Sequence, residues 1–139
     1  MNQESSNRAQ MRKGILEYCI LLILSKHDAY ASDILNALKE VDMLVVEGTL
    51  YPLLTRQKNA GLLNYRWEES TQGPPRKYYA LTDTGRQALC DMDASWNELQ
   101  ISIETLRKTT DLSAECAEMA MESQKKSPTN QNRPTQPKP

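Results

Sequence analysis

The amino-acid sequence predicts a mainly α-helical fold of the α+β class, with three short helices, a two-stranded hairpin and a long final helix. Apolar residues run almost without interruption from Ile15 to Leu24, as in a helix that is buried on most sides. The stretch "LNYRWEES", Leu63 to Ser70, alternates apolar and polar residues as a half-buried strand does. From Leu89 to Leu106, apolar residues recur at steps of three and four, which indicates one long helix with an apolar seam.

Composition limits the class of protein. With 139 residues the chain fits one domain, since a single core is usual up to roughly 150 residues. Seventeen basic and 18 acidic residues give a formal net charge of −1, so a surface for nucleic acid would have to be a local cluster. Cys19, Cys90 and Cys116 have no CxxC spacing, which argues against a disulfide framework and a zinc site. We expect no metal and no cofactor.

Targeting and catalytic signals are lacking in the sequence. Met1–Gln10 has no apolar core of a signal peptide, and the run from Ile15 to Leu24 contains Glu17 and is too short to span a bilayer. We therefore expect no membrane association and a cytoplasmic location. His27 is the single histidine and has no paired carboxylate or nucleophile in a motif. The chain is not expected to be an enzyme, and we assign no catalytic residue.

Two helices are expected at the start of the ordered chain. The first is the apolar run, which should be the central core helix. The second lies in "YASDILNALKEVD", where Ser32 can cap the exposed amides. Its apolar face is formed by Ile34, Leu35, Leu38 and Val41, which fall on one helical stripe.

A short strand is expected in the β-branched run "MLVVEG", and a third helix should follow it. This helix should begin at Glu47 or Gly48, because Pro52 is tolerated only near the first turn. One face carries Leu50, Leu53, Leu54 and Gln57, and Gly61 supplies the stop.

A β-hairpin should follow the third helix. On its first strand Leu63, Tyr65 and Trp67 share the buried side. The stretch "TQGPP" is expected to be the turn, because glycine and two prolines do not fit inside a ladder, and "RKYYAL" returns as the second strand. Thr82 can then cap a long helix that begins near Asp83.

The long helix carries a coiled-coil seam that predicts a dimer. The seam consists of Leu89, Met92, Trp96, Leu99, Ile103 and Leu106. An indole is too bulky for close knobs-into-holes packing, so something must fill or tolerate the space around Trp96. One interpretation is an aromatic platform for a flat, apolar or cationic effector, with Met92 and Leu99 beside it. The other is that Trp96 packs against its dimer mate or the core helix.

Three helices followed by a hairpin are the order of a winged helix-turn-helix, in which the third helix enters the major groove and the hairpin forms the wing. The stretches "GTLYPLLTRQKNAGLL" and "GPPRKYYALTDTGR" are similar to those of the PadR family of bacterial transcriptional regulators. The likeness extends over roughly Met11 to Leu106 and resembles the short branch, which dimerises through one C-terminal helix. It places Trp96 at the position of the tryptophan that multidrug-sensing members carry. The family usually has leucine where this chain has Gln57, which we expect to be partly exposed.

Composition, helical periodicity and the resemblance together predict a division of the chain and a set of DNA contacts. We expect a disordered tail over 1–10, a winged helix-turn-helix DNA-binding domain over 11–82, a dimerisation helix over 83–109 and, over 110–139, a helix extension that fades into a disordered tail from Ser123. Charged and polar side chains of the third helix and the wing are the expected contacts, namely Thr49, Tyr51, Pro52, Thr55, Arg56, Lys58, Arg76 and Lys77. Alternatively, the basic side chains form an ordinary solvated face and Tyr51 is a packing residue.

The expected function is that of a homodimeric transcriptional repressor. It would bind a pseudo-palindromic double-stranded DNA operator near its own gene and be released by a small planar effector at Trp96, Met92 and Leu99. The alternative is a protein-interaction winged helix without sequence-specific DNA binding, which the near-neutral net charge favours.

Overall fold

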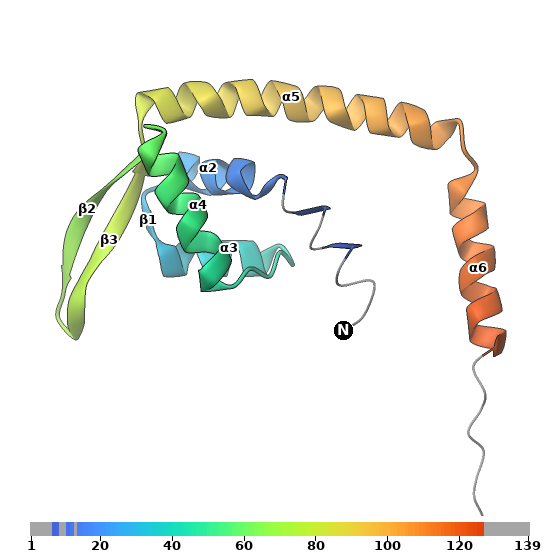
Figure 1. Ribbon diagram of the computed structural model, residues 1–139, viewed down its shortest axis with the longest axis horizontal. Coiled ribbons are helices and arrows are strands. Elements are labelled where there is room, and N and C mark those ends of the chain that lie inside the picture. Colours follow the sequence, from blue (N-terminus) through green and yellow to red (C-terminus); the bar gives the residue numbers. More distant parts are fainter. Residues whose placement is uncertain (1–6, 9–10, 13, 127–139) are drawn as a thin grey trace, which may run out of the picture. The chain divides into compact units, whose positions relative to one another are not determined.

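The computed structural model describes residues 7–8, 11–12 and 14–126, and it divides into two compact units (Figure 1). The first unit extends to Asn97 and the second begins at Glu98. Most of the predicted tail 1–10, and residues 127–139 of the predicted C-terminal tail, lie outside the described residues. Within the described part, Ser123 to Lys126 belong to a helix, so the predicted start of the tail at Ser123 is wrong. No helix in the described part of the chain has the length and apolar character needed to cross a membrane.

Three helices and a small sheet enclose the core of the first unit. The helices are α2 (Leu16–Lys26), α3 (Ala31–Glu40) and α4 (Glu47–Asn59). The predicted core helix is confirmed as α2, whose side chains Ile20, Leu21 and Leu24 are almost completely buried. They meet apolar side chains of the other elements, chiefly Ala29, Ile34, Leu38, Leu50, Leu54, Leu63 and Tyr79.

The sheet has three antiparallel strands in the order β1-β3-β2, where a two-stranded wing was predicted. They are β1 (Ala29–Tyr30), β2 (Leu63–Ser70) and β3 (Gly73–Leu81). The strand predicted in "MLVVEG" is wrong, since residues 43–46 join no ladder. The open edge of β3 is taken by β1 instead. Met43 and Val45 still pack against the core while Leu44 and Val46 are exposed, so the β-branched run reflects side-chain packing without strand pairing.

Helix α3 starts one residue earlier than its predicted cap. The residue before the helix is Tyr30, whose amide donates a hydrogen bond to the Asp33 carboxylate at 3.0 Å. Ser32 therefore lies inside the first turn, exposed, and is not the cap. Val41, predicted on the apolar face, is also exposed because the helix ends at Glu40 before the next turn of the stripe.

Helix α4 begins at Glu47, as predicted. Pro52 nevertheless lies in the second turn, and because proline has no amide hydrogen it cannot donate to the carbonyl of Gly48. The prediction that Gln57 is partly exposed is wrong, since its side chain is only 2% exposed. Its Nε2 donates to the carbonyl oxygen of Glu17 at 3.0 Å, which offsets part of the cost of burying the amide. No hydrogen-bond partner in the described residues reaches its Oε1.

The hairpin turn begins at Thr71 as predicted but is shorter, since it comprises only Thr71 and Gln72. The predicted turn residues Gly73, Pro74 and Pro75 instead begin β3. Prolines are tolerated there because the opposite strand has an irregular register between Glu68 and Ser70 and because β1 pairs only with Tyr78 and Tyr79.

Trp67 lies on the same side of β2 as the buried Leu63, but its side chain is 61% exposed and not half-buried as predicted. The buried core does not extend as far along β2 as this residue. An exposed indole therefore faces outward from the wing, beside other aromatic side chains.

Thr82 joins three parts of the first unit through one hydroxyl. Its Oγ1 accepts a hydrogen bond from the Gly85 amide at 2.9 Å, which confirms the predicted cap of α5 (Asp83–Lys108). The single hydrogen of the same hydroxyl is shared between two carbonyl oxygens, that of Gly61 at 2.6 Å and that of Leu62 at 3.0 Å. The end of α4, the start of β2 and the first turn of α5 therefore meet at a single side chain.

The second unit contains the rest of α5 and the helix α6 (Leu112–Lys126). Turn residues at 109–111 separate the two helices, so the segment after residue 109 is a helix of its own and not an extension of α5.

Replacing Gly85 by alanine is expected to lower the free energy of unfolding by about 3 kcal/mol, because overpacking against backbone leaves little room for relaxation. A Cβ atom at this position would lie 2.1 Å from the carbonyl oxygen of Leu62. Urea denaturation followed by circular dichroism measures the change. Gly48→Ala is the matched control, since that site is open within 4 Å and lies in a helix, where alanine stabilises by about 0.5–1 kcal/mol. Equal stability of the two variants would contradict the predicted close contact at Gly85.

Candidate nucleic-acid interface

Helix α4 has one buried and one exposed face. Leu50, Leu54 and Gln57 are buried, and they recur at the three- and four-residue steps of one helical stripe. All six predicted contact residues of this helix are exposed, namely Thr49, Tyr51, Pro52, Thr55, Arg56 and Lys58. The structure therefore brings them together on the solvent side of α4, where a helix that enters a major groove needs its polar side chains.

Both cations of α4 have partners within the protein. The Arg56 guanidinium lies 2.7 Å from the Glu17 carboxylate, and the Lys58 ammonium lies 5.2 Å from the centre of the Tyr65 ring. The Arg56 side chain is 73% exposed, but that of its partner Glu17 is only 25% exposed, so removing the cation would leave a partly buried carboxylate unpaired. A phosphate that binds Arg56 would therefore have to share the guanidinium with Glu17.

The two basic residues of the wing point to opposite faces of β3, because neighbouring strand residues alternate. Lys77 lies on the face of Tyr65 and Trp67, with its ammonium 4.6 Å and 5.6 Å from the two ring centres. Arg76 lies on the other face, with its guanidinium carbon 4.0 Å from the centre of the Tyr30 ring. Each cation is therefore packed on an aromatic side chain.

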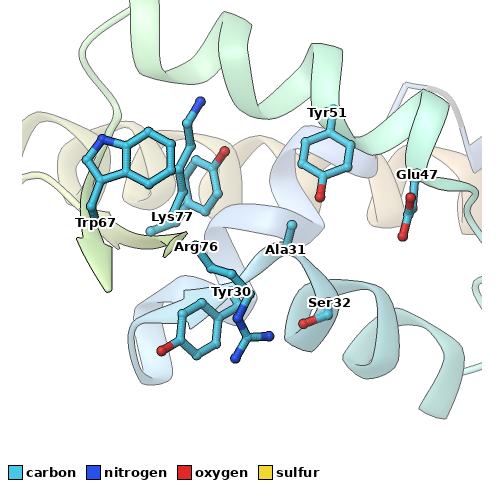
Figure 2. A pocket seen from close by; sticks show the side chains of 9 residues that line it. Tyr30, Ala31, Ser32, Glu47, Tyr51, Trp67, Arg76 and Lys77 are labelled. Carbon is cyan, nitrogen blue, oxygen red and sulfur yellow. The ribbon is translucent and has the colours of Figure 1, made fainter. Parts of the chain in front are cut away.

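A hollow of about 280 Å³ lies between the start of α3, the start of α4 and the wing (Figure 2). It combines aromatic rings, hydroxyl groups, the cations Arg76 and Lys77 and the carboxylate of Glu47. Its lining residues are Tyr30, Ala31, Ser32, Glu47, Tyr51, Trp67, Arg76, Lys77 and Tyr79. Tyr79 is the most buried aromatic side chain of the hollow, and this burial raises the pKa of its phenol. A concave, cationic and aromatic surface beside an exposed helix face suits the sugar–phosphate backbone of DNA.

Comparison with known proteins shows the family of this chain. The model of the transcriptional regulator PadR-like family matches residues 20–91, just over half of the 139 residues. The chain belongs to this PadR-like family. A PadR-like transcription factor from Bacteroides fragilis is 59% identical, with 73% of this chain and 98% of that chain covered and a TM-score of 0.63.

Two further solved structures show the same likeness. A PadR family transcriptional regulator from Eggerthella lenta is 32% identical over 76% of this chain and 93% of that chain, with a TM-score of 0.67. A PadR-like transcriptional regulator from Bacillus cereus is 37% identical over 70% of this chain and 95% of that chain, with a TM-score of 0.62. The protein is therefore a DNA-binding transcriptional regulator with a winged-helix α+β fold, and it is not an enzyme.

The residues of the predicted seam of this PadR-like protein are divided between the two units. In the first unit, Leu89 and Met92 are partly buried against the core. The Trp96 ring lies 6.3 Å from that of Tyr18 on α2, centre to centre. The Tyr18 hydroxyl donates to Asp93 Oδ1 at 2.5 Å, and this hydrogen bond raises the pKa of Tyr18 to about 12. Within the protomer, Trp96 thus has a neighbour on the core helix, as one of the two sequence interpretations expected.

In the second unit, the remaining seam residues Leu99, Ile103 and Leu106 are 55%, 49% and 68% exposed. Helix α6 adds further exposed apolar side chains, Leu112, Met119 and Met121. Both helices therefore present apolar surface that the described residues of one chain leave uncovered.

The cysteines and the histidine are placed apart. Cys90 and Cys116 are exposed, and burial raises the pKa of the Cys19 thiol. Across residues 7–8, 11–12 and 14–126, no three side chains of His, Cys, Asp or Glu are grouped so that they could hold a metal ion.

Sequence reasoning missed six residues of the hollow: Tyr30, Ala31, Ser32, Glu47, Trp67 and Tyr79. The position of Tyr30 depends on its pairing with Tyr78, which lies 48 residues along the chain and leaves no local signal. The two helix-start residues Ser32 and Glu47 could have been found from the fold, since helix starts flank the wing in a winged helix.

Proposed function

We propose that this PadR-like regulator is a homodimeric repressor that binds a pseudo-palindromic operator in the cytoplasm. The observation that carries the proposal is the exposed face of α4 next to the cationic hollow of the wing. Each α4 would enter a major groove, and the two grooves would be about 34 Å apart, one turn of the duplex. Thr49, Tyr51, Pro52, Thr55, Arg56 and Lys58 would meet base edges and phosphates there, while Arg76 and Lys77 would bind the flanking backbone.

A second copy of the chain is the proposed cover for Leu99, Ile103 and Leu106. Their steps of four and three residues form a straight row along a helix, which suits packing against the same row of a partner. Apolar surface removed from water contributes roughly 25 cal/mol per Å², and a two-fold symmetric interface gains it on both chains. Leu89, Met92 and Trp96 would extend this interface next to the DNA-binding domain.

Gel-shift titration with a duplex from the chain's own promoter tests the DNA-binding part of the proposal. Binding should weaken steeply as salt rises, because lysine and arginine release counterions from phosphates. Binding that is absent at low salt, or that does not depend on salt, would instead favour a protein-interaction winged helix. Repression is tested separately, by transcription from the same promoter with and without the protein.

The proposed effector is a small planar apolar molecule, aromatic or cationic, that stacks on Trp96 near Met92 and Leu99. An indole face attracts flat rings and cations. Bound between two α5 helices, such a ligand would act only through a difference in affinity for the DNA-bound and free arrangements.

Trp96→Ala is expected to leave operator affinity within about tenfold, or 1.4 kcal/mol, and to abolish release by planar aromatic cations. The ring is assigned to ligand stacking and does not belong to the DNA contacts. Fluorescence anisotropy of labelled operator measures both quantities, in titrations with planar aromatic cations that are first shown not to bind the free duplex and to release the wild-type protein. Normal release of the Trp96→Ala variant would place the effector site elsewhere.

A further inference from the structure

Two tyrosines and two arginines form one continuous stack on the wing, which we call the arginine–tyrosine stack. Tyr30 of β1 and Tyr78 of β3 are register partners, and their rings meet edge to face with centres 4.7 Å apart. The Arg66 guanidinium carbon lies 4.5 Å from the centre of the Tyr78 ring. Arg76 lies 4.0 Å from the centre of the Tyr30 ring. Each tyrosine of the stack thus carries one guanidinium.

The two arginines differ in how their charge is neutralised. Arg66 lies 2.7 Å from Glu68 and 3.2 Å from Asp28, and these hydrogen bonds raise the pKa of its guanidinium. Among the described residues, Arg76 forms no ion pair. Glu68 is the register partner of Arg76 across the hairpin, yet its Oε1 is bound by Arg66. Two carboxylates therefore bind the Arg66 guanidinium, whereas the Arg76 guanidinium has no carboxylate partner among the described residues and can bind an external anion.

The Tyr30 ring also orients the guanidinium of Arg76. Figure 2 shows the Arg76 side chain extended beside the Tyr30 ring, at the edge of the hollow that Ser32 and Tyr51 also line. An unconstrained arginine loses rotamer entropy when it is immobilised. Stacking on a ring removes part of that loss before any anion binds. Glu47 lines the hollow too, and its negative charge disfavours an anion at the α4 end.

We propose that Tyr30 is a positioning residue that holds Arg76 ready for a backbone phosphate of duplex DNA at the wing side of the hollow. Arg66 packs on Tyr78 in the same stack, but Glu68 and Asp28 neutralise its charge, so it does not bind DNA. The inference rests on the proposed contact between the wing and DNA. It assigns to Tyr30, a residue outside the recognition helix and the hairpin, a part in DNA affinity.

Fluorescence anisotropy with a mixed-sequence duplex of about 30 base pairs tests the inference, because a phosphate contact is independent of sequence. Arg76→Gln should weaken binding about three- to tenfold and lower the slope of log K against log salt by roughly 0.9 for each phosphate that the variant no longer binds. Tyr30→Leu should weaken binding in the same direction, by about two- to fivefold, because the guanidinium is no longer pre-ordered. Tyr30→Phe keeps the ring and should bind as the wild type does.

The matched control removes the other arginine of the stack. Arg66→Gln alone would free Glu68 to pair with Arg76, so the control combines Arg66→Gln with Glu68→Gln. This double variant should keep both the affinity, within about twofold, and the salt slope of the wild type. A decrease in slope equal to that of Arg76→Gln would show that Arg66 binds a phosphate, which overturns the division of roles.

A double-mutant cycle separates positioning from a merely structural role. In the Arg76→Gln background, Tyr30→Leu should have no further effect on affinity. An equal decrease in both backgrounds, or wild-type binding by Tyr30→Leu, overturns the inference while leaving the wing contact intact. If Arg76→Gln itself keeps wild-type affinity and slope, the wing contact of the proposed function fails instead. Thermal unfolding of each variant identifies any decrease that comes from damage to the fold.

Discussion

Leu99→Asp is expected to give a monomeric protein that no longer binds its operator. Leu99 is 55% exposed in the protomer and lies in one row with Ile103 and Leu106 on α5. In a symmetric dimer the substitution places two carboxylates in an apolar interface, and each loses its water without a cation to replace it. The cost of several kcal/mol exceeds what an interface of a few leucine and isoleucine side chains can offset. A monomer presents one α4, so it lacks the gain from two linked half-sites.

Size-exclusion chromatography with light scattering measures the mass, and gel shift measures operator binding by the same samples. Ile101→Asp is the matched control, because Ile101 is 69% exposed on the same helix but lies two residues from Leu99, on another face. The control should remain dimeric. A Leu99→Asp protein that keeps the dimer mass would contradict the assignment of this row as the interface.

Tyr51→Ala is expected to weaken operator binding by about 30- to 150-fold without unfolding the protein. Tyr51 is 48% exposed, belongs to the exposed face of α4 and lines the hollow beside the wing. Removing one good interaction with DNA per half-site corresponds to about 1–1.5 kcal/mol, and the dimer is affected twice. Because about half of the side chain is outside the core, the melting temperature should change little.

Anisotropy titration of the operator at fixed salt measures the change in affinity, with the mixed-sequence duplex as reference. Tyr51→Phe is the control that separates the hydroxyl from the ring: retained affinity assigns the interaction to the ring, and an intermediate decrease assigns part of it to the hydroxyl. Wild-type affinity of Tyr51→Ala on both duplexes would show that Tyr51 is a packing residue of the α4 surface.

Local signals were enough to predict the main elements of this fold. The apolar run of α2 and the Thr82 cap of α5 act within one or two turns of the chain, so their effects can be recognised from neighbouring residues. The fold class followed from the order of these elements. One error concerns pairing at long range: β1 occupies the edge of β3, and local sequence patterns cannot distinguish this from an edge paired with residues 43–46. Other errors, such as the cap of α3 and the extent of the hairpin turn, concern the exact ends of elements, which neighbouring residues specify only to within a few positions.

In the candidate site, too, local sequence patterns predicted some features, whereas other contacts depend on the assembled sheet. The exposed face of α4 follows from helical periodicity, and the structure agrees with it at all six predicted positions. The stack of Arg76 on Tyr30 depends on the register between β1 and β3, and the freedom of Arg76 depends on Glu68 being bound by Arg66. Such contacts result from the assembled sheet. They have no counterpart in the spacing of residues along the chain.

The hydroxyl of Thr82 has a mechanical consequence. It bonds the carbonyls of Gly61 and Leu62 while it holds the amide of Gly85, so the first turn of α5 is fixed to the segment that ends α4. A tilt of α5 at this end therefore has to carry the end of α4 with it or break a hydrogen bond. The orientation of α4 is therefore coupled to that of α5 at a single side chain, and an effector that bound α5 as proposed could change the exposed face of α4 without acting through the hydrophobic core.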